Sequence, residues 1–150
     1  LWELLEIRKI LEVEVAGLAA ERAGLDDVAA MRLQLDRMRN SIEVPEGYVD
    51  ADVEFHALLA RATRNEVLLT MLEPVVDLLR ASRRVSAARP GNALRALGEH
   101  ERILRRVEAG DAGGAREEMS AHLSKTAEDI EAAIGEGVLD AGELVEKEGV

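Results

Sequence analysis

The spacing of the apolar residues constrains the fold of this chain more than any other feature. Between residues 2 and 23, the apolar side chains Leu4, Leu11, Val15 and Leu18 recur at the spacing of one face of an α-helix. Similar spacing recurs along most of the chain. Strands favour aromatic and β-branched residues, and the 150 residues include only one Trp, one Tyr and one Phe. We therefore expect an all-α fold.

Breaks in this pattern divide the chain into about six expected helices. Gly24 is expected to end the first helix, and residues 41–47, with Pro45 and Gly47, form an expected loop. A bend is expected near Pro74, because proline removes one backbone hydrogen bond. The expected helices span residues 2–23, 27–40, 48–63, 66–88, 92–109 and 111–134. The pattern predicts a single domain built as an antiparallel helical bundle.

Composition excludes several classes of function. The formal net charge is −11, and so acidic a surface is repelled by phosphate backbones. The chain contains no cysteine, which excludes disulfide scaffolds and thiolate zinc sites. Its apolar runs are too short to span a membrane. We expect a cytoplasmic protein that has no membrane partner and does not bind nucleic acid through this part.

The three histidines are the main candidates for a functional site. Asp52 and His56 are four residues apart, which places them on one helix face, roughly 6 Å apart along the axis. His100 and His122 fall on the apolar stripes of two later helices. Burying an unpaired carboxylate is costly, and one divalent cation at the bundle centre would satisfy all four groups. Nitrogen and oxygen ligands of this kind suit Zn, Ni, Mn, Fe or Co better than Ca or Mg.

Two other interpretations remain open at this point. A single histidine on an apolar face is usually a hydrogen-bonded core residue, so a purely structural bundle is possible. A metal-dependent enzyme, either a hydrolase or an oxygen-binding bundle, is the second alternative, because such a site can activate water. The pattern offers no general base for it, since Glu54 is two residues from both Asp52 and His56 and is turned away from their face.

An ordered set of motifs resembles the FCD domain, the C-terminal effector-binding domain of FadR-type GntR transcription regulators. Residues 52–59, DVEFHALL, resemble the motif D-x-x-F-H-x-x-L of that domain. Arg64 and Glu66 replace the Gly and Pro that are usual in its G-N-P-x-L motif. Further similar segments are residues 5–12, 19–23, 99–104 and 115–123. The resemblance covers about residues 2–134.

The resemblance implies a metal-dependent sensor rather than an enzyme. In that family an aspartate and three histidines bind a divalent metal, and the matching residues here are Asp52, His56, His100 and His122. The implied metal is Zn, Ni, Mn or Fe. The family's effectors are usually small organic acids, such as sugar acids, hydroxy acids and dicarboxylates, whose carboxylate can occupy the open metal positions.

The resemblance also implies how the domain is used. We expect residues 1–135 to form an FCD-type ligand-binding and dimerisation domain, followed by an acidic C-terminal tail at 136–150. The family carries an N-terminal winged helix-turn-helix, which this chain does not contain. A homodimer is expected, with DNA bound only through that separate domain.

Two further residues are candidates for an effector pocket. Arg8 falls on the inward stripe, where its guanidinium could clamp a carboxylate, and the family's first-helix arginine often has this role. The alternative is an ion pair with Glu12, four residues later. Asn65 is a second candidate for the pocket, although capping the following helix is the favoured interpretation. Three polar residues near the end of the helix 66–88 could reach an effector, but a solvated face is the favoured interpretation for them: Arg83, Arg84 and Ser86.

Overall fold

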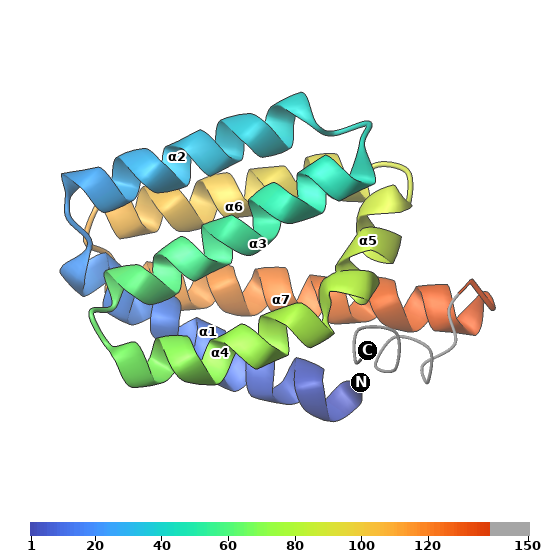
Figure 1. Cartoon of the computed structure of the whole chain (residues 1–150), viewed down its shortest axis with the longest axis horizontal. Coiled ribbons are helices and arrows are strands. Elements are labelled where there is room, and N and C mark those ends of the chain that lie inside the picture. Colours follow the sequence, from blue (N-terminus) through green and yellow to red (C-terminus); the bar gives the residue numbers. More distant parts are fainter. Residues whose placement is uncertain (139–150) are drawn as a thin grey trace.

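The computed structural model describes residues 1–138, and this part of the chain contains seven helices and no strand (Figure 1). The helices are α1 Trp2–Arg22, α2 Leu25–Asn40, α3 Pro45–Ala62, α4 Glu66–Leu78, α5 Arg80–Ala88, α6 Asn92–Glu108 and α7 Ala112–Gly135. The expected all-α fold is confirmed. Most of the expected tail at 136–150 lies outside the described residues.

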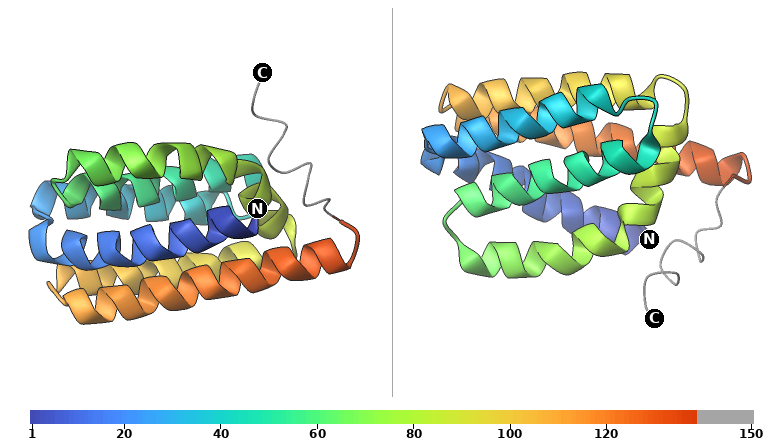
Figure 2. Two further views of the ribbon diagram at one scale, coloured as in Figure 1. Left: turned by 90° about the horizontal axis from the view of Figure 1, so that it is seen from below. Right: turned by 45° about the horizontal axis from the view of Figure 1, so that its top comes forward.

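The seventh helix arises because the expected helix 66–88 is divided into α4 and α5. Pro74 lies inside α4 and does not end it. The break falls five residues later, at Leu79, whose φ of −96° and ψ of 1° depart from helical values. Leu79 is fully buried, and α5 continues from it across one end of the bundle (Figures 1 and 2). The chain therefore turns here to bury an apolar side chain, without a glycine or proline at the turn.

Two helix boundaries also differ from expectation. α3 begins at Pro45 instead of residue 48, because proline fits the first helical position, where its missing N–H costs nothing. α1 ends at Arg22, and Gly24 belongs to the start of α2. The Gly24 N–H donates to the Asp27 carboxylate at 2.8 Å.

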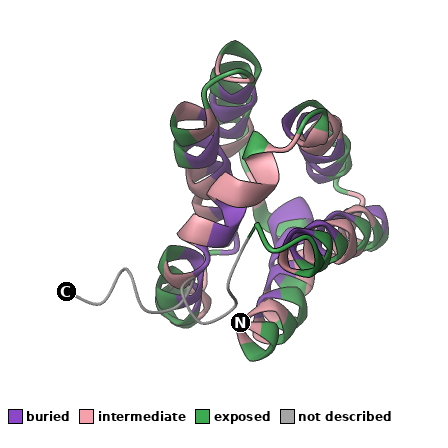
Figure 3. Ribbon diagram, turned by 90° about the vertical axis from the view of Figure 1, so that its right-hand side faces the viewer, coloured by how far each residue is buried: buried purple, intermediate pink, exposed green. Residues whose placement is uncertain are grey.

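The core is formed by the inward faces of the long helices. α1 packs along α7, α2 along α3, and α6 along α7, while α3 also contacts α1 and α5. Figure 3 shows the buried residues facing the interior of this bundle. The fully buried side chains include Met31, Met38, Phe55, Leu59, Ile103 and Met119. Within the described part, no helix combines the length and apolarity needed to cross a membrane.

Candidate metal centre

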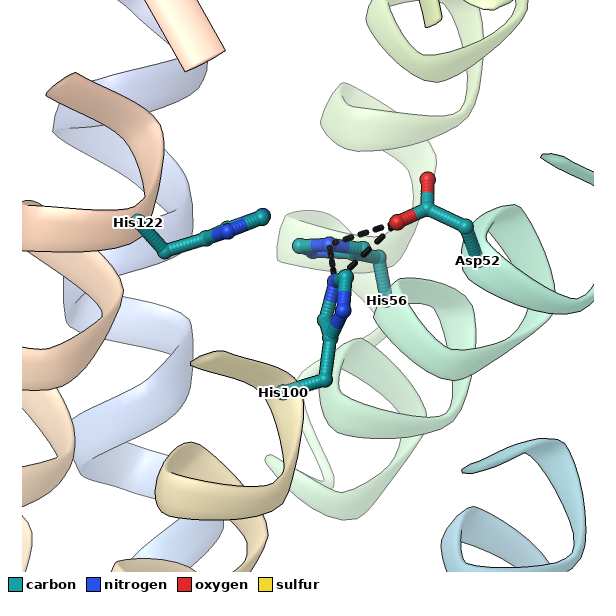
Figure 4. Close-up of side chains that lie close together, drawn as sticks. All are labelled: Asp52, His56, His100 and His122. Atoms are coloured by element: carbon teal, nitrogen blue, oxygen red, sulfur yellow. Dashed lines mark hydrogen bonds and ion pairs between the residues drawn. The ribbon is translucent and has the colours of Figure 1, made fainter. Parts of the chain in front are cut away.

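Three helices bring Asp52, His56, His100 and His122 together in the core (Figure 4). Asp52 and His56 come from α3, His100 from α6 and His122 from α7, and all four are buried. One ligand atom from each residue lies within 4.8 Å of all the others. His100 Nε2 is 3.0 Å from Asp52 Oδ1 and 3.2 Å from His56 Nε2. The predicted juxtaposition of the four residues is therefore present.

These spacings are close to those of ligands around one metal ion. Nitrogen and oxygen ligands lie about 2.1 Å from a transition metal, so neighbouring ligands of a six-coordinate site are about 3.0 Å apart and opposite ones about 4.2 Å. His122 Nε2 is buried and has no hydrogen-bond partner in the described structure. An ion among the four side chains would give this nitrogen a partner and would compensate the buried negative charge of Asp52. The residues present therefore fit a divalent transition metal.

Two carboxylates hold the outer nitrogens of the histidines. Glu12 contacts Nδ1 of His56, and Glu99 Oε2 lies 2.7 Å from Nδ1 of His122. Metal-bound histidines commonly donate their second N–H to a carboxylate in this way. When Nδ1 carries the proton, Nε2 presents its lone pair to the centre of the cluster. The two glutamates thus contact the outer nitrogens of His56 and His122 and leave their Nε2 atoms on the side of the cluster.

The protonation states of the cluster suit ligation. Burial lowers the pKa of His122 to about 3, with His100 adding to the shift and Glu99 opposing it. Burial alone would raise the pKa of Asp52, but Arg83 and the two nearest histidines hold it well below its usual range. The pKa of Glu12 is also well below its usual range, because Arg8 and His56 outweigh its burial. A neutral imidazole and an ionised carboxylate are the forms that bind metals.

Two arginines are buried beside this cluster. Arg8 faces inward as predicted, and it forms the ion pair with Glu12 that was the alternative to a ligand role, at 2.6 Å from Nε to Oε1. Arg83 was expected on a solvated face, and this expectation is wrong. It is buried and donates through Nη1 to Asp52, because α5 folds over the end of α3. The separate path of α5 after Leu79, which the apolar spacing did not reveal, produces this contact.

A small cavity adjoins the cluster on the side of α5. Its volume is about 30 Å³, which is room for about one water molecule. Ser86, expected on a solvated face, lines this cavity. Arg84 is half-buried, and its Nε lies 3.7 Å from Oε1 of Glu46. The complete lining is Arg8, Tyr48, Val49, Asp52, Arg83, Ser86, Ala87, Asn92, Ala93, Ala96, His122 and Thr126.

Several donors on the cavity wall have no hydrogen-bond partner within residues 1–138. These buried atoms are Arg8 Nη2, Tyr48 Oη, Arg83 Nε, Arg83 Nη2 and Asn92 Nδ2. Burial, together with the charges of Asp52 and Glu99, raises the pKa of the Tyr48 phenol, so its hydroxyl stays protonated and can donate. The wall is rich in donors and suits a ligand that is rich in acceptors.

Asn65 caps α4. Its Oδ1 accepts from the backbone N–H of Val67 at 3.1 Å and of Leu68 at 3.2 Å, and it does not line the cavity. Glu54 points away from the cluster, as expected, and its carboxylate pairs with Arg61 at 2.7 Å on the surface.

Apolar spacing and motifs did not identify Glu12, Glu99 and Arg83 as residues of the candidate site. Glu12 was considered only as a partner of Arg8, although it lies on the same inward stripe and this was a usable signal. Glu99 and Arg83 reach the site across helix interfaces. Their roles depend on how α6 meets α7 and how α5 meets α3, which spacing along the chain does not specify.

Comparison with known proteins gives a consistent set of matches. The FCD domain family matches residues 3–125. The chain is 38% identical over 134 residues to the HTH-type transcriptional regulator LutR of Bacillus subtilis, covering 85% of this chain and 60% of that protein. It is 34% identical over 127 residues to a putative L-lactate dehydrogenase operon regulatory protein of Escherichia coli, covering 82% of this chain and 48% of that protein.

Solved structures share the fold. Escherichia coli McbR/YncC matches with a TM-score of 0.77 at 18% identity, over 87% of this chain and 67% of that chain. Streptococcus agalactiae GntR matches with a TM-score of 0.68 at 22% identity, over 82% of this chain and 55% of that chain. The chain spans about half to three fifths of the length of the two regulators described above.

Proposed function

The chain belongs to the FCD domain family of GntR-type transcription regulators, and on that premise we propose that it senses a small organic acid through one bound divalent metal ion. Its relatives are named as regulators, in agreement with the expectation that the domain is not an enzyme. Two of them, both from Escherichia coli, are named for the L-lactate dehydrogenase and galactonate operons. Those names favour a hydroxy acid or a related acid as the effector.

One observation carries the metal assignment: four buried ligand atoms converge, and two of the histidines are oriented by buried glutamates. Asp52, His56, His100 and His122 would hold the ion. Nitrogen and oxygen ligands favour Zn, Ni, Mn or Fe. When bound, the ion supplies positive charge and open coordination positions for a carboxylate.

Arg8 is the proposed clamp for the acid. Its Nε is held by Glu12, whereas Nη2 is buried at the cavity without a partner. A guanidinium held in this way can donate to a carboxylate with little further loss of side-chain entropy. We assign Asn65 to the cap of α4 and not to the pocket, because its side-chain oxygen already accepts two backbone N–H groups.

Signalling requires that the acid prefer one arrangement of the helices. The cavity on the α5 side holds about one water, so an acid that enters it would displace part of its wall, and α5 is the shortest helix on that wall. We propose that residues 1–135 form the sensing and dimerisation domain of a cytoplasmic regulator. A shift of α5 would then alter the spacing of two winged helix domains that bind DNA and lie outside this chain.

The test combines elemental analysis with thermal shift. The purified chain should hold one metal ion, and small organic acids should raise the melting temperature of the metal-loaded form. Absence of metal after growth with Zn, Ni, Mn and Fe would refute the metal assignment. If no acid shifts the melting temperature of the loaded chain, the sensing role is wrong. Steady turnover of an acid would instead support the alternative that the domain is a metal-dependent enzyme.

A further inference from the structure

The partnerless donors on the cavity wall come from helices on different sides of it. Arg8 belongs to α1, Tyr48 to α3, Arg83 to α5 and Asn92 to α6. Tyr48 is 3% exposed and Arg83 is 6% exposed, so neither side chain can turn to bulk water for a partner. A buried donor that lacks an acceptor destabilises the folded state. The wall therefore needs more acceptors than a single metal-bound carboxylate group supplies.

Two of these donors, Tyr48 and Asn92, extend away from the proposed metal centre, whereas Arg83 also donates to Asp52. Tyr48 precedes Asp52 by one turn of α3, and Asn92 precedes His100 by eight residues, or roughly 12 Å along α6. α3 and α6 both begin at the end of the bundle that α5 crosses (Figure 1). Tyr48 and Asn92 thus lie on the α5 side, and Arg83 reaches the same cavity from α5 itself.

The buried charges indicate how much negative charge a ligand should bring. The guanidinium groups of Arg8 and Arg83 are matched by the carboxylates of Glu12 and Asp52. The remaining carboxylate at the cluster, Glu99, lies 2.6 Å from Nη1 of Arg95, which also pairs with Asp129. A divalent ion would add positive charge among these pairs, and a buried charge is costly without a counter-charge.

We propose that Tyr48, Arg83 and Asn92 form a second anion-recognition subsite, which makes this domain select dicarboxylates over monocarboxylic acids. One carboxylate lies at the metal centre and Arg8, and the second accepts hydrogen bonds from the subsite. The inference rests on the proposed function, because it specifies which acid the same site binds.

The test measures affinities for matched acids. The 150-residue chain is loaded with Zn²⁺ and titrated by calorimetry with succinate, L-malate, propionate and L-lactate. We expect the dicarboxylates to bind at least about tenfold more tightly, since each hydrogen bond to a charged group contributes about 1.5–3 kcal/mol. Tyr48→Phe removes only the hydroxyl, and it should reduce succinate and malate affinity about tenfold while leaving propionate affinity unchanged.

Asn92→Asp keeps the side-chain shape and replaces the donor with a negative charge, so it should also weaken malate binding. Asn40→Asp places the same charge at an exposed position of α2 and serves as the control, with malate affinity unchanged. Circular dichroism and metal content verify that each variant folds and is loaded. Equal affinity for both classes of acid, or a preference that neither cavity variant reduces, would overturn the subsite but leave the sensing role. Binding of no acid would overturn both.

Discussion

Glu12 and Glu99 each place a carboxylate on the outer nitrogen of a proposed histidine ligand. Replacing either residue with glutamine keeps its volume and removes its charge. We expect Glu12→Gln and Glu99→Gln to weaken metal binding about 10- to 100-fold, because the histidines lose orientation and basicity. Competition with a chelating dye measures the change.

Glu54→Gln is the matched control for these variants. Glu54 lies on α3 beside the site in sequence, but its carboxylate pairs with Arg61 on the surface. Metal affinity should stay at the wild-type value. An equal loss in all three variants would show that removal of any acidic charge weakens the metal, and that the two buried glutamates have no special role.

Substitution of Asn65 distinguishes a role in capping α4 from a role in binding the acid. Asn65→Ala removes the acceptor for two backbone N–H groups at the start of α4. The free energy of unfolding should fall by about 1 kcal/mol, measured by urea denaturation, whereas acid affinity should not change. A loss of acid affinity at unchanged stability would place Asn65 in the pocket.

Single residues show how far sequence reasoning reaches. The inward placement of Asp52, His56, His100 and His122 was predictable because each lies on an apolar stripe, and the periodicity of a helix fixes which face a residue takes. Arg83 was misplaced because charged side chains are rarely buried unless they are paired. Its partner, Asp52, lies 31 residues away in the chain, and periodicity within one helix cannot reveal such a pair.

At the scale of elements, α5 is the segment that local sequence predicts least well. Helix propensity and apolar spacing continue from α4 into α5, so residues 66–88 were expected to form one helix. The chain leaves that path at Leu79 because folding α5 over the end of the bundle buries Leu79 and pairs Arg83 with Asp52. Tertiary packing decides this turn. Pro74, where a bend was expected, lies within α4 and does not end the helix.

The stability that the Asp111 cap gives to the start of α7 should depend on pH. Asp111 caps this helix by accepting from the Gly114 N–H at 2.9 Å. That hydrogen bond, with Arg106 nearby, lowers the pKa of Asp111 despite the opposing effect of desolvation. A lowered folded-state pKa means that ionised Asp111 stabilises the fold above the unfolded-state pKa, and that this stabilisation is lost as pH falls through the folded-state value.

Asp111→Asn keeps a capping oxygen but removes the charge. We expect the variant to be less stable than wild type at pH 7, with the difference shrinking as pH falls below about 4, where the free carboxyl protonates. Thermal melts of both proteins between pH 3 and pH 7 measure the difference. A gap that stays constant across this range would mean that the charge of Asp111 does not contribute.

At the scale of the whole molecule, the bundle was predictable because one repeated pattern specifies it. Each long helix carries an apolar stripe, and burying these stripes together largely determines an all-α architecture. The pattern does not specify which helices are neighbours. The pairing of α1 with α7 and of α2 with α3 depends on side-chain fit across interfaces.

Removing the proposed metal should destabilise the whole domain. A ligand that binds only the folded state at a thousand times its dissociation constant stabilises that state by about 4 kcal/mol. We expect EDTA to lower the melting temperature of the metal-loaded chain, and excess Zn²⁺ to restore it. His100→Ala should abolish the response to both additions. A melting temperature insensitive to EDTA in a chain shown to hold metal would place the ion outside the core.

The size of the cavity has a kinetic consequence. If the proposed acid binds in this cavity, which has room for about one water, part of the wall must move to admit it. Capture would then wait for α5 to open, so the observed binding rate should level off at high acid concentration instead of rising in proportion to it. The same wall would delay escape of a captured acid. A regulator built in this way averages the supply of its effector over time and does not follow brief fluctuations.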